Sequence, residues 1–585
     1  MIRLLYLVTI LICALPLIPG VLGIVLPALS WLPALGLYTP NFSAFHIAFQ
    51  WSGLSQSIFL TLFTGIGSTV LAITLCFFIL RANWNSPRWQ RIEHLIAPML
   101  ALPHVAFAIG FAFTFAPTGW LFRLLESIGI DTSSAFILIQ DPYGIGLLFA
   151  LAIKETPFLL LMSVSVLHQI RVNQLQAVAA GLGYNHNESW LKVVLPQWLP
   201  KMRMPIYAVL AYGLSVVDIA LILGPTRPPT LAVLVWQWFN EPDLLLITRA
   251  AVGALLLLTV SFSVLALARA IEWFAFDIKR EWQISGAFRP QATLPLTTRS
   301  NKIKRHTGLS GRLHWPFFIV PIVVVPVLLL WSFAQRWRFP DVLPSRYSAR
   351  FWLQESNTLI ELATSSAMLA CISACLALIL AIGCLEYRQK YQRGLPTWLI
   401  ALPMVIPQLS ILFGMQISTY FISGQYYCFW VIWSHVLFAF PYLYLSLDGP
   451  WRSYDIRLDQ SARSLGMNAW ATWWKVKRPL MMPAIWLAIA VGMSVSLAQY
   501  LPTQILGAGR ISTLTTEAVA LASGQDRRVS AVYGLLQGLL PLIFFTLALI
   551  ASRYSGNFSR RKKSIQRQTR STNTDDLICG KPHYK

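Results

Sequence analysis

Apolar runs of about twenty residues recur along the whole chain, and they restrict its fold more than any other feature. A segment of about 20 apolar residues crosses the hydrocarbon core of a bilayer as a helix. Of the 585 residues, 56% are hydrophobic and 12% are charged, whereas a soluble domain carries about 25% charged residues. The chain is therefore predicted to be an all-α polytopic membrane protein.

Twelve spans are predicted, in two sets of six. The first set lies at about 4–28, 55–80, 95–116, 142–168, 204–224 and 250–271. The second set lies at about 316–334, 357–384, 397–421, 428–448, 483–501 and 530–551. The predicted parts of the chain are a first domain (1–275), a basic cytoplasmic linker (276–314), a second domain (315–552) and a basic cytoplasmic tail (553–585).

The net charge of +23 raises the question of nucleic-acid binding. The basic residues, however, gather in short segments between the spans and in the tail. Basic residues beside spans hold loops in the cytoplasm and contact anionic membrane lipid. We therefore expect no nucleic-acid partner, and with twelve spans both termini are predicted to be cytoplasmic.

A short segment before the fifth span of each set carries a pattern that returns 283 positions later, as at Gly183 and Gly466. The first copy (171–203) contains Ala177, Ala179, Ala180, Leu182, Gly183, Trp190 and Pro196. The second copy (451–482) contains Gln460, Ala462, Leu465, Gly466, Trp473 and Pro479. Each copy predicts a short helix that ends at its glycine, then a second helix with an aromatic surface that ends at prolines. In the first copy, that second helix is predicted to start at Asn187-Glu188-Ser189.

This pattern resembles the EAA loop in the permease subunits of bacterial ABC importers. In that family Glu-Ala-Ala is followed by Leu-Gly and, about a dozen residues later, by Leu-Pro; here Gly183 precedes Pro196, and Gly466 precedes Pro479, by 13 positions. Six spans with the loop between the fourth and fifth also match, and they occur twice. The whole chain is similar to the fused double permeases of the iron(III), thiamine and YnjC-like kinds.

The resemblance implies a type I importer permease in the bacterial inner membrane. Each loop would dock on a separate ABC ATPase subunit, present in two copies, and a periplasmic solute-binding protein would deliver a small molecule or ion. The sequence has no Gly-x-x-x-x-Gly-Lys-Ser/Thr phosphate loop. ATP is therefore expected to be used by the partner, with no cofactor bound by this chain.

Two features depart from the family pattern. The glutamate of the motif is replaced by Ala177 in the first copy and by Gln460 in the second. The Leu-Pro pair is Arg478-Pro479 in the second copy. Docking through small and apolar residues is compatible with these changes, but a salt bridge from the glutamate position is not.

Several polar residues fall inside predicted spans, where an ionisable side chain is costly unless it faces the protein interior or a water path. Asp218 lies in the fifth span, and Gln499 was aligned with it in the second set. Both are predicted to line the translocation path, with a structural hydrogen bond as the alternative for Asp218. Lys154 and Glu155 are expected to find partners on other spans, and His435 is expected to be a hydrogen-bonded core histidine.

No arrangement of residues predicts a catalytic site, and Cys371 and Cys375 lack the further ligands that a metal site would need. The protein is therefore not expected to be an enzyme. The main alternative function is a secondary, ion-coupled transporter with duplicated halves. Such a carrier should show ionisable residues at matching interior positions, whereas Asp218 is aligned with an amide.

Overall fold

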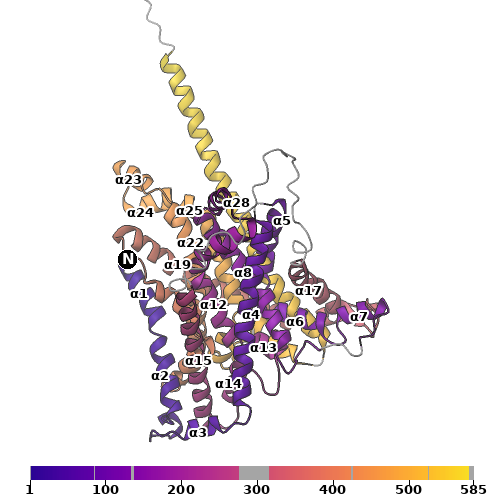
Figure 1. Cartoon of the computed structure of the whole chain (residues 1–585). Helices are drawn as coiled ribbons and strands as arrows, with labels where there is room; N and C mark the ends of the chain where they lie inside the picture. Colours follow the sequence, from indigo (N-terminus) through magenta and orange to yellow (C-terminus); the bar gives the residue numbers. More distant parts are fainter. Residues whose placement is uncertain are drawn as a thin grey trace, which may run out of the picture.

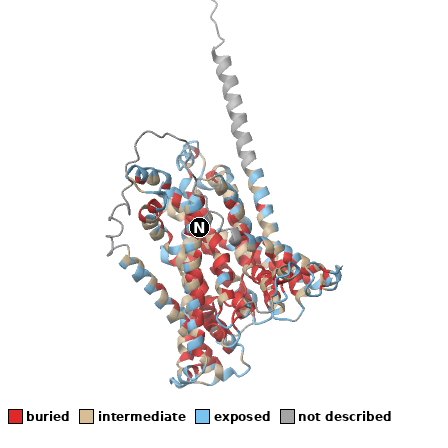
Figure 2. Cartoon of the chain, turned by 45° about the vertical axis from the view of Figure 1, so that its right-hand side comes forward, coloured by how far each residue is buried: buried red, intermediate tan, exposed pale blue. Residues whose placement is uncertain are grey.

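The computed structural model describes residues 2–84, 86–132, 137–275, 315–422, 426–524 and 526–578, so the predicted linker lies outside it. In these parts the chain forms a bundle of helices, and its one small sheet is an antiparallel pair of strands (Figure 1). Buried residues concentrate in the middle of the bundle (Figure 2).

The helices of the two halves follow one another in a repeated order. The first half contains α1 (Ile2–Ala14), α2 (Leu17–Ala28), η1 (Pro33–Leu35), α3 (Ser43–Phe49), α4 (Leu54–Asn83), α5 (Pro87–Ala101), α6 (His104–Phe115), α7 (Trp120–Ser127), α8 (Ile145–Gln169), α9 (Val172–Gly181), α10 (His186–Glu188), η2 (Ser189–Val194), α11 (Leu195–Lys201), α12 (Arg203–Ser215), α13 (Asp218–Leu223), α14 (Leu231–Phe239), η3 (Leu244–Leu246) and α15 (Ile247–Trp273). The second half contains α17 (Trp315–Phe333), β1 (Ala334–Arg336), β2 (Arg346–Tyr347), α18 (Arg350–Gln354), α19 (Ser356–Tyr391), α20 (Thr397–Val405), α21 (Gln408–Thr419), α22 (Tyr427–Ser453), α23 (Arg457–Ser464), α24 (Ala469–Thr472), η6 (Trp473–Lys477), α25 (Arg478–Leu497), α26 (Leu501–Leu506), α27 (Leu514–Ala522) and α28 (Arg527–Ile578).

Among the described residues, nine helical segments are long and apolar enough to cross a bilayer, and the bent pair α20 and α21 would be a tenth. Two more predicted spans correspond to shorter helices. One is α17, whose apolar part runs from Phe318 to Phe333, and the other is divided into α12 and α13. The predicted all-α polytopic membrane fold is therefore confirmed.

The third predicted span of each half is broken by a proline. α5 ends just before Pro103, and α20 ends just before Pro407, with an angle of 91° between α20 and α21. Proline has no N–H to donate to the preceding turn, and it forces the residue before it towards an extended conformation. The runs 95–116 and 397–421 are therefore each two helices rather than the single span that was predicted.

The fifth predicted span is also broken in both halves. Val216 has extended backbone angles, which separates α12 from α13. In the second half, α25 ends at Leu497 and α26 begins at Leu501, where Pro502 cannot donate a hydrogen bond to Ala498. α13 and α26 begin 283 positions apart, the same offset as the duplicated loops. By this register the counterpart of Asp218 is Leu501, so the sequence alignment of Asp218 with Gln499 was wrong by two residues.

The first helices of each half pack on the opposite half. α1 lies against α19, α2 lies against α21, and α17 lies against α6, while α2 and α17 also pack on α15 and α28 of their own halves. At the end of α1, Arg3 donates to the Tyr391 hydroxyl (3.1 Å), and the rings of Tyr6 and Tyr387 stack with their centroids 3.9 Å apart. The halves are therefore held together by an exchange of helices in addition to their shared interface.

Glycines permit this exchange. A Cβ atom on Gly414 of α21 would overlap the backbone of Gly20, and one on Gly23 would overlap the backbone of Gly414. At the corresponding place in the first half, a Cβ atom on Gly110 of α6 would overlap Val324 of α17. Small residues let membrane helices approach closely, which explains why Gly110 and Gly414 recur in the two halves.

Candidate functional site

The first duplicated loop begins with the short helix α9. At its end, the N–H of Tyr184 donates to the Ala179 carbonyl (3.0 Å) and the N–H of Gly183 donates to the Ala180 carbonyl (3.1 Å). Gly183 has φ +85°, a left-handed conformation that glycine adopts without a steric penalty. These two bonds are the pattern by which a glycine terminates a helix.

The second loop repeats this geometry in α23. Met467 donates to the Ala462 carbonyl (3.1 Å), and Gly466 donates to the Arg463 carbonyl (2.9 Å). Gly466 has φ +87°. The two helix ends predicted at Gly183 and Gly466 are therefore confirmed, and their backbones have nearly the same form.

An asparagine caps the second helix of each loop. The Asn185 side chain accepts from the N–H of Glu188 (2.9 Å), and the Asn468 side chain accepts from the N–H of Ala471 (2.8 Å). This side-chain acceptor satisfies a backbone donor that a helix start leaves free. The start that the sequence placed at Asn187-Glu188-Ser189 in fact lies two residues earlier. A π-helical turn follows in both loops and continues directly into α11 and α25, which carry Pro196 and Pro479 in their first turns. The prediction that these prolines end the second helix was therefore wrong, since a proline is tolerated in the first turn of a helix.

The ends of α9 and α23 present the same surface to solvent. Leu182 is 71% exposed and Leu465 is 84% exposed, although a leucine gains about 2 kcal/mol when it is buried. Ala179 and Ala462, one helical turn earlier, are buried at corresponding positions. The other exposed residues of the predicted loop set are Ala177, Ala180, Gln460, Gly466 and Pro479. Each loop therefore exposes one leucine side chain at the end of its first helix. The opposite side of that helix, which carries the buried alanine, packs against the protein.

The tryptophans of the two loops differ in burial. Trp190 is fully buried against Phe77 of α4, with ring centroids 5.8 Å apart. Trp473 is only half-buried, next to Trp474, and Trp470 is exposed. The second loop thus adds aromatic surface beside Leu465 that the first loop lacks.

A buried ion pair anchors the second loop to the body of the protein. Lys477 forms an ion pair with Glu386 of α19 (2.5 Å) and donates to the Gln389 side chain. The Trp451 indole donates to the same glutamate (3.0 Å). At the corresponding position the first loop has Val194, which packs in a hydrophobic cluster. The two loops therefore share an outer shape but have chemically different anchors.

Tyr454, next to this ion pair, holds the start of the second loop. Its hydroxyl donates to Asp459 of α23 (2.6 Å). Burial, and secondly this bond to a carboxylate, raise the pKa of Tyr454. The phenol therefore remains a hydrogen-bond donor at physiological pH.

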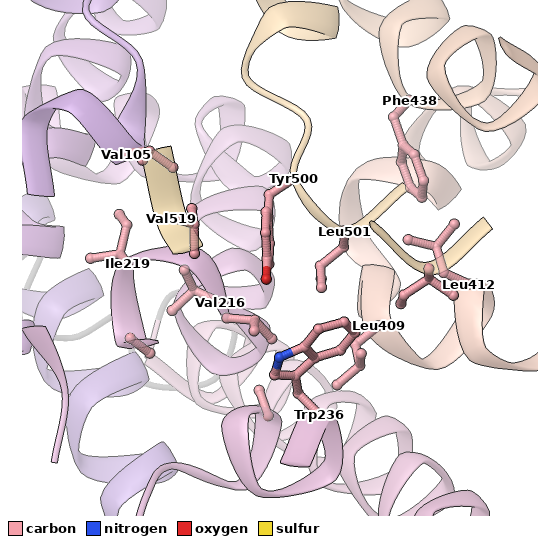
Figure 3. Close-up of a cluster of buried hydrophobic side chains, with 14 of the residues drawn as sticks. Val105, Val216, Ile219, Trp236, Leu409, Leu412, Phe438, Tyr500, Leu501 and Val519 are labelled. Carbon is pink, nitrogen blue, oxygen red and sulfur yellow. The ribbon is translucent and has the colours of Figure 1, made fainter. Parts of the chain in front are cut away.

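Apolar side chains of both halves close the interior between them (Figure 3). Tyr500 of the second half points towards Val216 and Trp236 of the first, and its ring centroid lies 6.1 Å from that of Trp236. The other labelled members are Val105, Ile219, Leu409, Leu412, Phe438, Leu501 and Val519, all of them buried. We call this set the apolar gate. Because its members come from the breaks in the third and fifth spans and from neighbouring helices, a movement of those short helices would rearrange it.

On one side of the gate lies a cavity of about 280 Å³ between the halves. Its lining includes Ile222 of α13 from the first half and Arg527 of α28 from the second. Ile222 is one turn beyond Asp218 on the same short helix. α13 therefore carries a residue of this cavity (Ile222) and a residue of the apolar gate (Ile219), and it begins with Asp218.

No family model matches the chain. Over 549 residues, however, it is 31% identical to the inner membrane ABC transporter permease protein YnjC of Escherichia coli strain K12, a match that covers 92% of this chain and 94% of that protein. The chain belongs to the ABC transporter permease family. The family assignment makes it a transport protein of the inner membrane, and its apolar helices are long enough to cross a bilayer.

Two more distant relatives agree with this assignment. The permease is 23% identical over 496 residues to the thiamine transport system permease protein ThiP of the same strain, with 82% of the permease and 86% of ThiP covered. It is 26% identical over 140 residues to the spermidine/putrescine transport system permease protein PotC of that strain, which covers 23% of the permease. The match to ThiP along most of both chains fits the fused double permease that the sequence predicted.

The two predicted path residues of the permease lie in different surroundings. Asp218 begins α13 and is partly exposed, whereas its neighbours Val217 and Ile219 are buried. Gln499 is buried and lines a cavity of about 10 Å³ that includes Ser366 and Thr513 of its own half. The structure therefore does not bring the two residues into one symmetric site, and their path-lining role stays a prediction.

The other polar residues inside the spans have the partners that were expected. His435 contacts the hydroxyls of Ser496 (2.8 Å) and Thr503 (2.9 Å), as a hydrogen-bonded core histidine. Lys154 donates to the Met99 carbonyl (3.0 Å), and Glu155 contacts His104 (3.1 Å). Within the parts of the chain that the structure describes, no group of three or more His, Cys, Asp and Glu residues could hold a metal ion.

Sequence reasoning missed the aromatic and histidine neighbours of Asp218. His104 and Tyr212 of the first half, and Tyr442 and Tyr500 of the second, lie within electrostatic range of Asp218 or Glu155. Pro103 was the available signal for His104, since a proline inside an apolar run marks a helix break that exposes polar groups. Nothing in the sequence signals the approach of the two tyrosines from the other half.

Proposed function

We propose that this permease forms the substrate path of an ABC importer and is driven by a separate ATPase that docks on the two duplicated loops. The central support is the pair of matching loop tips, where Leu182 and Leu465 stand exposed at the ends of α9 and α23. Both tips belong to loops with the same glycine terminus, asparagine cap and π-helical turn. Two docking surfaces with the same backbone form and the same exposed leucine fit two ATPase copies, one for each half.

In this proposal ATP binding in the partner moves both loops, and the motion reaches the path through the helices that follow them. α11 and α12 follow the first loop and lead to the break at Val216, while α25 follows the second and leads to the break before Leu501. These breaks carry members of the apolar gate. The gate is therefore mechanically connected to both docking surfaces.

The proposal places the loops, the linker 276–314 and both chain ends in the cytoplasm. α23 and α24 lie at one end of the bundle and α3 lies at the other (Figure 1). The cavity lined by Arg527 then opens towards the outer face, where a periplasmic solute-binding protein would release its cargo. The basic residues of the loops agree with this orientation, since positive residues stay on the cytoplasmic side.

Docking is tested by placing a charge at each tip, as Leu182→Asp with Leu465→Asp, in the permease purified with the ATPase encoded beside its gene. Both leucines are exposed, so the substitutions cost little folding free energy. We expect at least a tenfold loss of the ATPase from the purified complex. Leu343→Asp is the matched control, because Leu343 is 58% exposed and lies between β1 and β2, outside both loops and outside the membrane-spanning helices. Equal ATPase recovery from the double variant and the control would contradict the proposal.

The ion-coupled transporter remains the competing function. It needs no ATPase, so purified permease alone in vesicles would then concentrate a solute when only a proton or sodium gradient is applied. The importer predicts no such accumulation.

A further inference from the structure

A group of polar side chains from both halves meets where the helices are broken. Glu155 contacts His104 at 3.1 Å, and the ring of His104 lies 5.0 Å from that of Tyr212. Asp218 lies within electrostatic range of His104 and Tyr500. These residues come from α6, α8, α12, α13 and the α25–α26 break, so separate elements converge on one place.

The second half contributes tyrosines. Tyr442 of α22 interacts with both Glu155 and Tyr212, and Tyr500 interacts with Asp218. Three tyrosines therefore lie within electrostatic range of one or both of the two carboxylates. Aromatic faces attract cations, and carboxylate and phenol oxygens accept hydrogen bonds from an ammonium group.

The members of this group are partly accessible although they lie inside the bundle. His104, Glu155, Tyr212, Asp218 and Tyr442 all keep intermediate exposure. Their neighbours along the helices are mostly buried, as at Lys154, Thr156, Val217 and Ile219. Polar residues at such depth face the interior or water rather than lipid. Five of the six side chains therefore keep some accessible surface inside the bundle, and the sixth, Tyr500, is buried as a member of the apolar gate.

The charge of the group is unbalanced. Glu155 is matched by His104 and by Lys154, whose ammonium is buried against the Met99 carbonyl (3.0 Å). Among the described residues no lysine or arginine forms an ion pair with Asp218. Asp218 is thus the carboxylate of the group that lacks a lysine or arginine partner. The Tyr212 hydroxyl is also shielded from solvent beside Asp218 without a well-formed hydrogen bond to a described residue.

We propose that these residues form a binding site in the path for a positively charged organic cargo, an ammonium-bearing small molecule. Asp218 supplies the negative charge opposite the cation. Tyr212, Tyr442 and Tyr500 supply aromatic rings and phenol oxygens. The Glu155–His104 pair forms one side of the site. An anion would meet uncompensated negative charge there, and a neutral apolar cargo would leave the carboxylates unpaired. The inference rests on the proposed function, because it names the kind of molecule that the interior accepts.

Charged thiol reagents measure the electrostatic potential of the site without knowledge of the cargo. The seven native cysteines are replaced, and Tyr442→Cys is introduced as a reporter in the full chain. The rate of labelling by the trimethylammonium-ethyl methanethiosulfonate cation is divided by that of the sulfonate-ethyl methanethiosulfonate anion. The matched control keeps native Cys428 as its sole cysteine. Cys428 is exposed and lies on the same helix, 14 residues away, which is roughly 21 Å and beyond the roughly 8–10 Å range of screened charges.

We expect the reporter to favour the cationic reagent about tenfold more than the control does. Asp218→Asn should remove most of that preference, Glu155→Gln should reduce it, and Asp218→Glu should retain it. Each of these substitutions is also made in the chain whose sole cysteine is Cys428. The labelling of Cys428 should be the same with and without the substitution, which shows that the chains remain folded. A reporter that reacts with neither reagent, that matches the control ratio, or that ignores Asp218→Asn would overturn the proposal. No ATPase takes part in the labelling, so its outcome is independent of whether the loops couple to one.

Discussion

Two pairs of residues show how one duplicated pattern acquired different chemistry. Gly183 and Gly466 keep the same left-handed backbone, since only glycine adopts it cheaply. Val194 and Lys477 occupy corresponding places, yet one packs in a hydrophobic cluster and the other is ion-paired. The glycine positions depend on the backbone conformation, and they hold the same residue in both copies. The positions of Val194 and Lys477 depend on packing, and they hold different residues.

At this scale, Lys477→Met should destabilise the permease. The substitution removes the partner of Glu386 and leaves that carboxylate beside the Trp451 indole, and loss of one member of a buried pair costs about 3 kcal/mol. A thermal unfolding scan of the purified chain should show a lower Tm.

Lys477→Met combined with Glu386→Gln is the matched control for this change. Removing the stranded charge should recover part of the lost stability. If the single variant unfolds at the wild-type temperature, the ion pair does not anchor the second loop.

The helix breaks are the elements on which function depends most. α13 and α26 are short helices that carry Ile219 and Leu501 into the apolar gate. The first helices of the two halves, in contrast, are exchanged and locked by close glycine contacts. Because the exchanged helices are held by close backbone contacts, we expect the short helices to move more readily than they do.

Gly414→Val tests the locked contact between α2 and α21. No rearrangement of side chains can relieve the overlap, because a Cβ atom would meet the backbone of Gly20. We expect a loss of correctly folded permease in detergent, seen as aggregation in size-exclusion chromatography.

Gly449→Ala is the control for this substitution, since a Cβ atom at Gly449 of α22 meets nothing within 4 Å. Alanine is favoured over glycine in a helix by about 0.5–1 kcal/mol, so this variant should be at least as stable as wild type. Equal behaviour of the two variants would show that α2 and α21 do not pack this closely.

The sequence predicted where the helices lie along the chain better than it predicted which helices contact one another. Apolar runs located the membrane segments, and the repeat located both helix-ending glycines, because these features depend on neighbouring residues. The breaks at Val216 and Leu501, and the convergence of Tyr442 with Glu155, depend on contacts between distant segments. Inside a membrane both lipid-facing and core-facing surfaces are apolar, so hydropathy does not reveal which faces meet.

At the scale of the whole molecule, the proposed function treats the permease as a path between two pseudo-symmetric halves. α13 carries Asp218, Ile219 of the apolar gate and Ile222 of the cavity between the halves. In the proposal the loops lie away from this path, so their movement reaches it through the helices. The proposal also requires the gate to stay shut without the ATPase.

Weakening the gate should make the resting permease leak. Tyr500→Ala with Trp236→Ala removes the two largest labelled rings between the halves. Vesicles containing this variant, without ATPase, should lose a trapped small cation at least several-fold faster than vesicles containing wild type.

A matched control replaces Trp470 by alanine, because this ring is 59% exposed in the second loop and does not belong to the gate. If the gate variant is as tight as this control, the apolar set does not seal the path.

The central claim, that two loops of one chain each receive an ATPase, is tested most directly by cross-linking. Leu182→Cys and Leu465→Cys, separately and together in a cysteine-free chain, carry a photoactivated maleimide in the complex with the ATPase. The account predicts one ATPase attached through either single site and two attached when both sites are present. Attachment of one ATPase at most, or none, in the double-site chain would contradict it.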